Sequence, residues 1–172
     1  MMKITVLVIL LSASVAYAGS HPSWDELATL YGQRIDSTNM ISFVQKYELG
    51  KIQKFDQGSF RPKDNSFAVM FGRNTIDCII LRVATATWGD RNWTSYALEL
   101  PFGLLATNTL SQVIAKYGVT NAGPETWFID DYKVWPHFES GTNKISEIYI
   151  WRTTNTNHTP EDTARKLADP QH

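Results

Sequence analysis

Cysteine is almost absent from this 172-residue chain, which contains Cys78 alone. A single cysteine cannot form an intramolecular disulfide, so a disulfide-stapled fold is excluded and packing must stabilise the protein. The histidines offer no pair at the i, i+4 spacing of a helical zinc site, and no cysteine stands at ligand spacing from them. They are His21, His137, His158 and His172. No metal or cofactor is therefore expected, and Cys78, inside an apolar run, is expected to be an inert thiol.

Catalytic motifs and an excess of one charge are also lacking. The chain has no Gly-x-Ser-x-Gly elbow, phosphate loop or dinucleotide fingerprint. Its net charge of −1 does not provide the basic field that non-specific nucleic-acid binding needs. Asp130 and Asp131 would point to opposite faces of a strand, which favours a solvated turn or a helix-cap partner over a catalytic dyad. Cys78 and His137 would act as nucleophile and base only if the fold joined them. We therefore predict no catalytic residue.

The chain has one long hydrophobic run, and it lies at the N-terminus. Lys3 precedes the apolar segment Ile4 to Leu11, and Ala16-Tyr17-Ala18 provides a small-x-small cleavage site. This order predicts a cleavable signal peptide over residues 1–18, with Gly19 as the new N-terminus. The apolar run is shorter than the roughly 20 residues that a membrane-spanning helix needs. Because Gly19 is not a cysteine, we expect export without a lipid anchor, to the periplasm in preference to secretion.

Two helices and a β-hairpin are predicted in the first half of the exported domain, which we expect to span residues 19–152. A capping box predicts a short helix over residues 24–31, and apolar residues at helical spacing predict a second helix capped by Asp36 or Ser37. After a polar stretch that contains Gly and Pro, alternating apolar residues predict a hairpin. Its two strands cover residues 67–71 and 76–83.

The same order of elements recurs roughly 70 residues later. A capped helix precedes a short strand over 127–129 and a hairpin of strands 132–138 and 145–151. We therefore predict an α+β fold of two tandem helix–β-hairpin units, about 24–83 and 94–152. The units would share one antiparallel sheet with the helices on one face.

The segment between the units and the C-terminal tail have weaker patterns. Trp88 to Trp93 resembles a hairpin tip or crossing loop, and Tyr96 to Leu100 predicts a strand. Residues 153–172 form a polar tail with a possible short helix over 162–168.

Several of these segments together resemble a family of small bacterial proteins built as tandem helix-plus-sheet units. The family pattern Leu-Gly-x-x-Ile-Asp corresponds to the segment Leu30 to Asp36, and Leu-Pro-Phe-Gly-Leu corresponds to Leu100 to Leu104. Further matches are Trp127, Asp131-Tyr132 and Ile145 to Ile148, and one departure is Tyr117, where the family has Leu.

This resemblance implies a binding protein, because it provides no catalytic residue. Some members of the family resemble immunity proteins of interbacterial toxin systems. The plan is also similar to the secreted β-lactamase inhibitor proteins and to the outer-membrane SmpA-type modules, which act by binding.

Strand alternation predicts which side chains face away from the helices. In the second unit they are Lys133, Trp135, His137, Glu147, Tyr149 and Trp151, and in the first unit Arg82 with Ala68, Met70, Cys78 and Ile80. A sheet face exposed to water should be polar, whereas this set includes two Trp and one Tyr. Trp, Tyr, Met and Arg are enriched in interfaces, so the pattern predicts a partner-binding surface.

Two alternatives stay open for this face. In the first, another element buries the face: the C-terminal tail, the loop around Trp88 and Trp93, or a second subunit. In the second, the aromatic residues of the face pair across strands and stabilise the sheet. The loop is itself a second candidate contact, through Trp88, Asp90 and Trp93.

We therefore expect an exported protein that binds and inhibits another protein. The first hypothesis is a periplasmic immunity protein that neutralises a cognate interbacterial toxin, such as a type VI or similar effector; an envelope enzyme is a further candidate partner. The alternatives are an envelope assembly module and a small secreted hydrolase.

Overall fold

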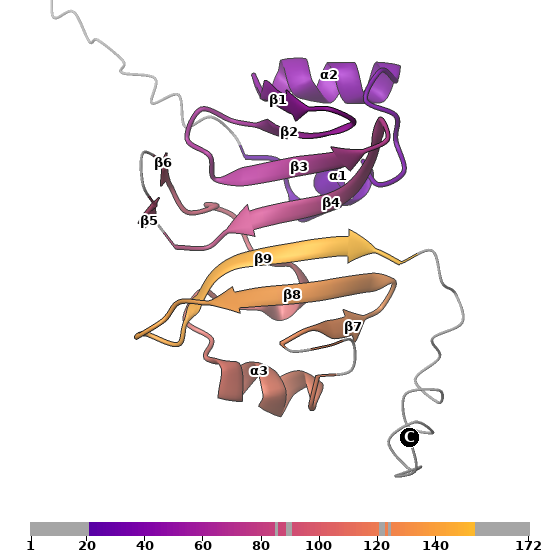
Figure 1. Ribbon diagram of the computed structural model, residues 1–172. Helices are drawn as coiled ribbons and strands as arrows, with labels where there is room; N and C mark the ends of the chain where they lie inside the picture. The colour runs from indigo at the N-terminus through magenta and orange to yellow at the C-terminus, as the bar shows by residue number, and fades with distance from the viewer. Residues whose placement is uncertain (1–20, 85, 89–90, 121–122, 124, 154–172) are drawn as a thin grey trace, which may run out of the picture.

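Seven antiparallel strands form one sheet in the order β1-β2-β3-β4-β9-β8-β7 (Figure 1). The strands are β1 (Gly50–Lys54), β2 (Gln57–Arg61), β3 (Phe67–Gly72), β4 (Thr75–Arg82), β7 (Trp127–Ile129), β8 (Tyr132–Phe138) and β9 (Ile145–Arg152). A separate two-stranded ribbon consists of β5 (Ala86–Trp88) and β6 (Arg91–Trp93). Both predicted hairpins are confirmed, as β3–β4 and β8–β9.

A computed structural model describes residues 21–84, 86–88, 91–120, 123 and 125–153. The predicted signal peptide, Asp90 and tail residues 154–172, including the possible helix over 162–168, lie outside these residues. The described chain has an α+β fold, as the sequence pattern predicts.

Side-chain caps determine where the helices begin. The described residues contain the helices α1 (Trp24–Ala28), α2 (Thr38–Lys46) and α3 (Leu110–Tyr117) and the short 3₁₀ helix η1 (Pro101–Gly103). Ser23 and Thr109 form capping boxes with Glu26 and Gln112, and the Ser37 hydroxyl accepts the Met40 N–H. Within the described residues, no helix is both long and apolar enough to cross a bilayer.

The three α-helices of the described residues contribute to one apolar core with a single face of the sheet. Leu27 of α1, Met40 of α2 and Val113 of α3 are fully or almost fully buried in the same cluster. Their sheet partners include Val69, Ile79, Leu81, Val134, Ile148 and Ile150. Val134, Ile148 and Ile150 alternate along β8 and β9 with the residues predicted to face away from the helices, so they lie on the core side of the sheet. Helix α1 is visible behind β3 and β4 in Figure 1.

Two predicted elements differ from the structure. The first helix ends at Ala28 instead of residue 31, because Thr29 N–H is shared between the carbonyls of Asp25 and Glu26 as the last turn tightens. Tyr96 to Leu100 is not a strand. Its Tyr96 N–H donates to the Arg82 carbonyl at 2.6 Å and its hydroxyl to the Pro22 carbonyl, so this segment is held by isolated bonds to different parts of the chain.

The structure also contains a hairpin, β1–β2, in the stretch that the sequence marked only as polar. Every residue of β1 is exposed, so this strand carries no apolar alternation that would have revealed it. Backbone pairing to β2 alone places it at the sheet edge, where its lysines discourage pairing with other chains.

We expect Ile148→Ala to destabilise the protein by about 3 kcal/mol, because Ile148 is 0% exposed at the centre of the core and truncation leaves a cavity. Chemical denaturation of the purified variant measures the free energy of unfolding. The control is Ile52→Ala on β1, 59% exposed, which should change it by less than about 0.5 kcal/mol. Equal effects of the two changes would contradict the assigned core.

Candidate functional site: the outer face of the sheet

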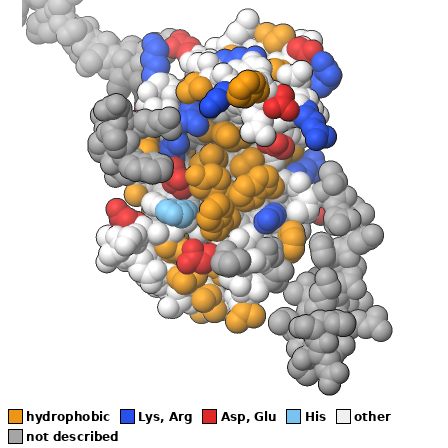
Figure 2. Space-filling model, viewed as in Figure 1, with side chains coloured by type: hydrophobic (Ala, Val, Ile, Leu, Met, Phe, Trp, Pro, Cys, Tyr) orange, Lys and Arg blue, Asp and Glu red, His pale blue; other side chains and the backbone are white. Residues whose placement is uncertain are grey.

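The sheet face opposite the helices, called the outer face here, collects the residues that alternation predicted for it. Cross-strand partners form three rows: Cys78–Trp151–Lys133, Ile80–Tyr149–Trp135 and Arg82–Glu147–His137. Because β4 pairs directly with β9, side chains about 70 positions apart in sequence lie beside each other. Figure 2 shows this face with an apolar patch at its centre and charged groups around it.

The centre of the outer face is a second, smaller apolar cluster. Ala68, Cys78 and Ile80 are buried there, and Met70, Tyr149 and Trp151 pack on them while staying partly exposed. We call these six residues the outer cluster. Trp135 extends the cluster onto β8, where its side chain is 36% exposed. Apolar groups therefore meet water on the face that a two-layer fold would leave polar.

The aromatic rings of this face contact one another, both across β8 and β9 and along β9. The Trp135 and Tyr149 ring centroids lie 5.2 Å apart, and those of Tyr149 and Trp151 lie 6.0 Å apart and nearly parallel. Lys133 Nζ lies 5.6 Å from the Trp151 ring, which fits a cation–π contact. Pairing of this kind stabilises a sheet by about 0.5–1.5 kcal/mol per pair. These contacts explain how the rings are arranged on the face. Because the rings are still partly exposed, apolar surface is left available for a partner.

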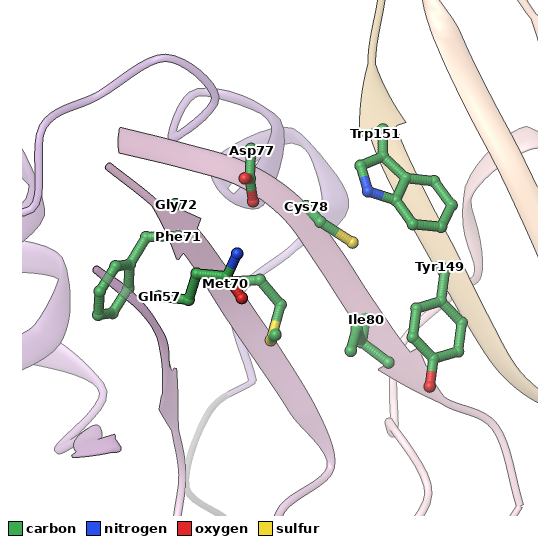
Figure 3. A pocket seen from close by; sticks show the side chains of 9 residues that line it. All are labelled: Gln57, Met70, Phe71, Gly72, Asp77, Cys78, Ile80, Tyr149 and Trp151. Atoms are coloured by element: carbon green, nitrogen blue, oxygen red, sulfur yellow. The ribbon is translucent and has the colours of Figure 1, made fainter. Parts of the chain in front are cut away.

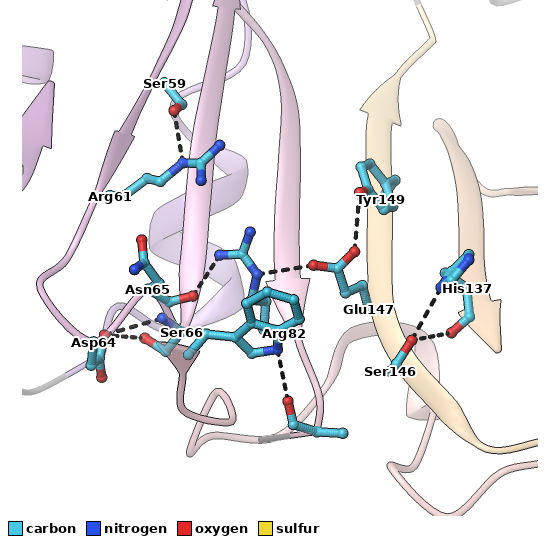
Figure 4. Close-up of polar contacts among 12 residues, drawn as sticks. Ser59, Arg61, Asp64, Asn65, Ser66, Arg82, His137, Ser146, Glu147 and Tyr149 are labelled. Carbon is cyan, nitrogen blue, oxygen red and sulfur yellow. Dashed lines mark hydrogen bonds and ion pairs between the residues drawn. The ribbon is translucent and has the colours of Figure 1, made fainter. Parts of the chain in front are cut away.

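One end of the outer face is closed by a partly buried ion pair (Figure 4). Arg82 Nε lies 2.9 Å from Glu147 Oε1, and the two side chains are only 8% and 15% exposed. Arg82 also donates to the Asn65 carbonyl at 2.6 Å, and Tyr149 donates to Glu147 at 3.0 Å. The Trp93 ring lies 4.7 Å from the Arg82 guanidinium carbon. Arg82 and Glu147, two of the predicted contact residues, therefore have their principal contacts inside the protein.

The second candidate contact, the loop around Trp88 and Trp93, is only partly described. Trp93 packs back on the domain, because its indole N–H donates to the Ala84 carbonyl at 3.0 Å and its ring covers Arg82. The Trp88 backbone belongs to β5, whereas its side chain and Asp90 lie outside the described residues. The expectation that this loop covers part of the outer face therefore holds for Trp93.

A depression of about 250 Å³ opens on the outer face, and most residues of the outer cluster line it (Figure 3). Its walls include Met70, Gly72, Asp77, Cys78, Tyr149 and Trp151. Sequence reasoning missed Asp77, because simple alternation would point it to the core. A β-bulge explains the difference: Met70 pairs with Cys78 but the next residue, Phe71, pairs with Ile76. The extra residue brings Asp77 and Cys78 to the same face.

Cys78, the nucleophile considered from the sequence, is not activated. Burial raises the pKa of the Cys78 thiol to about 12, which keeps it protonated at neutral pH. Cys78 and His137 lie in different cross-strand rows and have other partners: the Cys78 thiol donates to the Ile79 carbonyl at 3.8 Å, and His137 Nδ1 lies 3.2 Å from Ser146 Oγ. Asp130 has a φ of +51° between β7 and β8, which confirms the turn predicted for Asp130 and Asp131.

A His, an Asp and a Ser also meet near the N-terminal end, a cluster that sequence reasoning missed because its members are distant in the chain. His21 Nε2 lies 3.0 Å from both Asp64 Oδ2 and Ser66 Oγ, while His21 Nδ1 accepts the Ala97 N–H at 3.2 Å. In a catalytic triad the two ring nitrogens serve the acid and the hydroxyl separately. Here both partners share one nitrogen and Ser66 is 0% exposed, so the cluster anchors the chain segment at His21.

Metal-ligating side chains do not cluster in the described ranges, where no group of three or more His, Cys, Asp or Glu could hold an ion. This observation concerns residues 21–153 with their gaps and leaves the tail histidines aside.

Comparison with known proteins gives little further information. No family model and no curated protein matches the chain. Among solved structures, a cysteine-rich secretory protein from Staphylococcus aureus is similar, with a TM-score of 0.42 and 11% identity. The likeness covers 72% of this chain and 44% of that protein, so this chain spans less than half its length. A similarity at this level carries no conclusion about function.

We expect Arg82→Ala to destabilise the protein by about 3 kcal/mol, because it leaves the partly buried Glu147 carboxylate without its cation. Thermal and denaturant unfolding measure the loss. The matched control is Arg34→Ala, which breaks the exposed Arg34–Asp36 pair and should leave the unfolding midpoint unchanged. A wild-type midpoint for Arg82→Ala would show that the pair does not stabilise the domain.

Proposed function

We propose that this chain is an exported binding protein that inhibits a partner protein through its outer face. In its specific form, it is a periplasmic immunity protein that neutralises an interbacterial toxin. The observation that carries the proposal is the outer cluster, an apolar patch with partly exposed aromatic rings and a charged surround.

The composition of the patch suits a protein interface. Trp135, Tyr149, Trp151 and Met70 belong to residue types enriched at interface cores, and Lys133 and His137 provide a polar rim. Exposed contiguous apolar patches on monomers frequently mark binding sites. The same face offers no activated nucleophile, since Cys78 is a neutral thiol. These features favour binding over the small hydrolase that the sequence left as an alternative.

The proposal includes an architecture of two helix–hairpin units, about residues 24–83 and 94–152. Support comes from the order of strands, in which the hairpins β3–β4 and β9–β8 meet through β4 and β9. It also includes export through a cleaved signal peptide at residues 1–18, which rests on the sequence pattern. Export would confine the target to proteins met outside the cytoplasm.

The test is to mix the mature protein, residues 19–172, with the product of the adjacent gene and measure complex formation by calorimetry. Directing that product to the periplasm should kill cells that lack this chain and spare cells that express it. No complex and no protection would overturn the proposal. A permeability defect after gene deletion, without any toxicity from the neighbouring product, would instead support the envelope assembly module.

We expect Trp135→Ala and Trp151→Ala each to weaken the complex by roughly 2 kcal/mol, because partly exposed Trp side chains at the centre of a patch act as anchors. Calorimetry with the partner gives the change in affinity, and thermal unfolding checks that the variants stay folded.

The matched control for these two changes is Ile114→Ala. Ile114 is 37% exposed, close to the 36% of Trp135, but it belongs to α3 on the opposite side of the sheet. Its truncation should leave affinity unchanged. Equal weakening by all three changes would exclude the outer face as the specific contact.

A further inference from the structure

The depression on the outer face combines apolar walls with one carboxylate. Trp151, Tyr149 and Met70 give it two aromatic rings and a flexible thioether, and Asp77 lies at its β4 side (Figure 3). Aromatic faces and a carboxylate together suit a cation on an apolar stem, because the rings attract the cation and the carboxylate pairs with it.

The Asp77 carboxylate has no cationic partner among the described residues. The four described ion pairs involve Asp64, Asp36, Glu26 and Glu147. Two lysines on the same face have other neighbours: Lys133 Nζ lies over the Trp151 ring, and Lys54 Nζ lies 6.0 Å from the Phe55 ring. Asp77 is an exposed residue at the wall of the depression, so its carboxylate is available to a group from outside the described chain.

Burial raises the pKa of the Asp77 carboxyl, and the backbone N–H groups of Asp77 and Cys78 only partly oppose this effect. The free protein therefore holds the charged form at a cost, which an incoming cation would relieve. The other titratable groups of the depression are neutral at pH 7, because burial raises the pKa of Cys78 and of Tyr149 to about 12.

Gly72 makes room for this carboxylate. A Cβ placed on Gly72 would lie 2.9 Å from Asp77 Oδ2, closer than side-chain atoms approach. Because Gly72 has no side chain, the Asp77 carboxylate can lie over this end of β3, at the wall of the depression.

From this geometry we infer that the depression is a receptor for one basic side chain, an arginine or lysine, that the partner protein inserts into the outer face. The aliphatic stem of that side chain would lie against Met70, Ile80 and Trp151, and its cation would pair with Asp77. The inference deepens the proposed function and rests on it, because it specifies the chemistry that the partner must present.

The direct test uses small probes and does not need the partner. Isotope-labelled mature protein is titrated with N-acetyl-arginine methylamide, N-acetyl-lysine methylamide and, as the uncharged control, N-acetyl-norleucine methylamide. Saturable shifts of the Trp151 indole and Cys78 amide signals are expected with the cationic probes, at least tenfold tighter than with norleucine. The stronger of the two cations identifies the preferred side chain. Equal affinity for all three probes would overturn the inference.

Asp77→Asn keeps the shape of the depression and removes its charge. It should lower the affinity for the cationic probes at least tenfold and leave the affinity for the norleucine probe unchanged. Gly72→Ala should also lower the affinity for the cationic probes, because the added methyl group displaces the Asp77 carboxylate. The matched control is Asp130→Asn, at the exposed β7–β8 turn. Loss of probe binding in this control, or wild-type binding in Asp77→Asn, would contradict the assignment.

Acid should weaken binding of the cationic probes to the wild-type protein. Asp77 binds a cation only when ionised, so affinity should fall as the pH drops toward its raised pKa. In Asp77→Asn this pH dependence should disappear; if it persists unchanged, another group is responsible and the inference fails.

The last experiment tests whether the side chain that enters the depression comes from a partner or from this chain's own C-terminal tail, which contains Arg165 and Lys166. Replacing both with Ala in the mature chain should leave probe affinity unchanged. A tenfold increase in probe affinity would show that the tail occupies the depression and would overturn the partner assignment.

Once a partner has been identified, Asp77→Asn should weaken its complex with this chain at least tenfold. If the probes bind but Asp77→Asn does not weaken the complex, the inference about the partner is refuted and the proposed function still stands. If no complex forms at all, the proposed function itself is refuted.

Discussion

The pairing of β4 with β9 is the contact on which the rest of the structure depends. It joins the two hairpins into one sheet, and its register places Ile79 beside Ile150 in the core and Ile80 beside Tyr149 on the outer face. A slip of one residue would exchange these two faces, because side chains alternate along a strand. The Tyr31 hydroxyl, which donates to the Ile150 carbonyl at 2.7 Å, and the partly buried Arg82–Glu147 pair both favour the observed register.

The outer face combines sheet stability with available apolar surface. Its aromatic rings contact each other across β8 and β9, so each is ordered before any partner arrives. An ordered ring loses little conformational entropy on binding, which benefits affinity. The Arg82–Glu147 pair and Trp93 close one end of the face. The depression beside Asp77 lies over the other two rows, those of Trp151 and Tyr149. Ordered rings and one exposed carboxylate at the wall of the depression together suit recognition of a specific partner surface.

Sequence patterns predicted the outer face well but missed its most specific feature. Alternation placed Trp135, Tyr149 and Trp151 on one side, because regular strands impose a period of two. Asp77 escaped because a bulge breaks that period, although the run Ile76-Asp77-Cys78-Ile79 holds a clue: both isoleucines are buried in the core, with two residues between them. The β1–β2 hairpin escaped because its first strand is entirely exposed and carries no apolar signal.

The sequence by itself determined the local structure: the caps at Ser23 and Thr109, the two main hairpins and the division of their residues between two faces. These features depend on neighbours within a few positions, so local spacing reveals them. The tertiary structure alone decided that Arg82 meets Glu147, that His21 meets Asp64 and that Asp77 remains without a described cation. Such relations join residues far apart in the chain, and their energies arise from burial and charge that exist only once the sheet has closed around them.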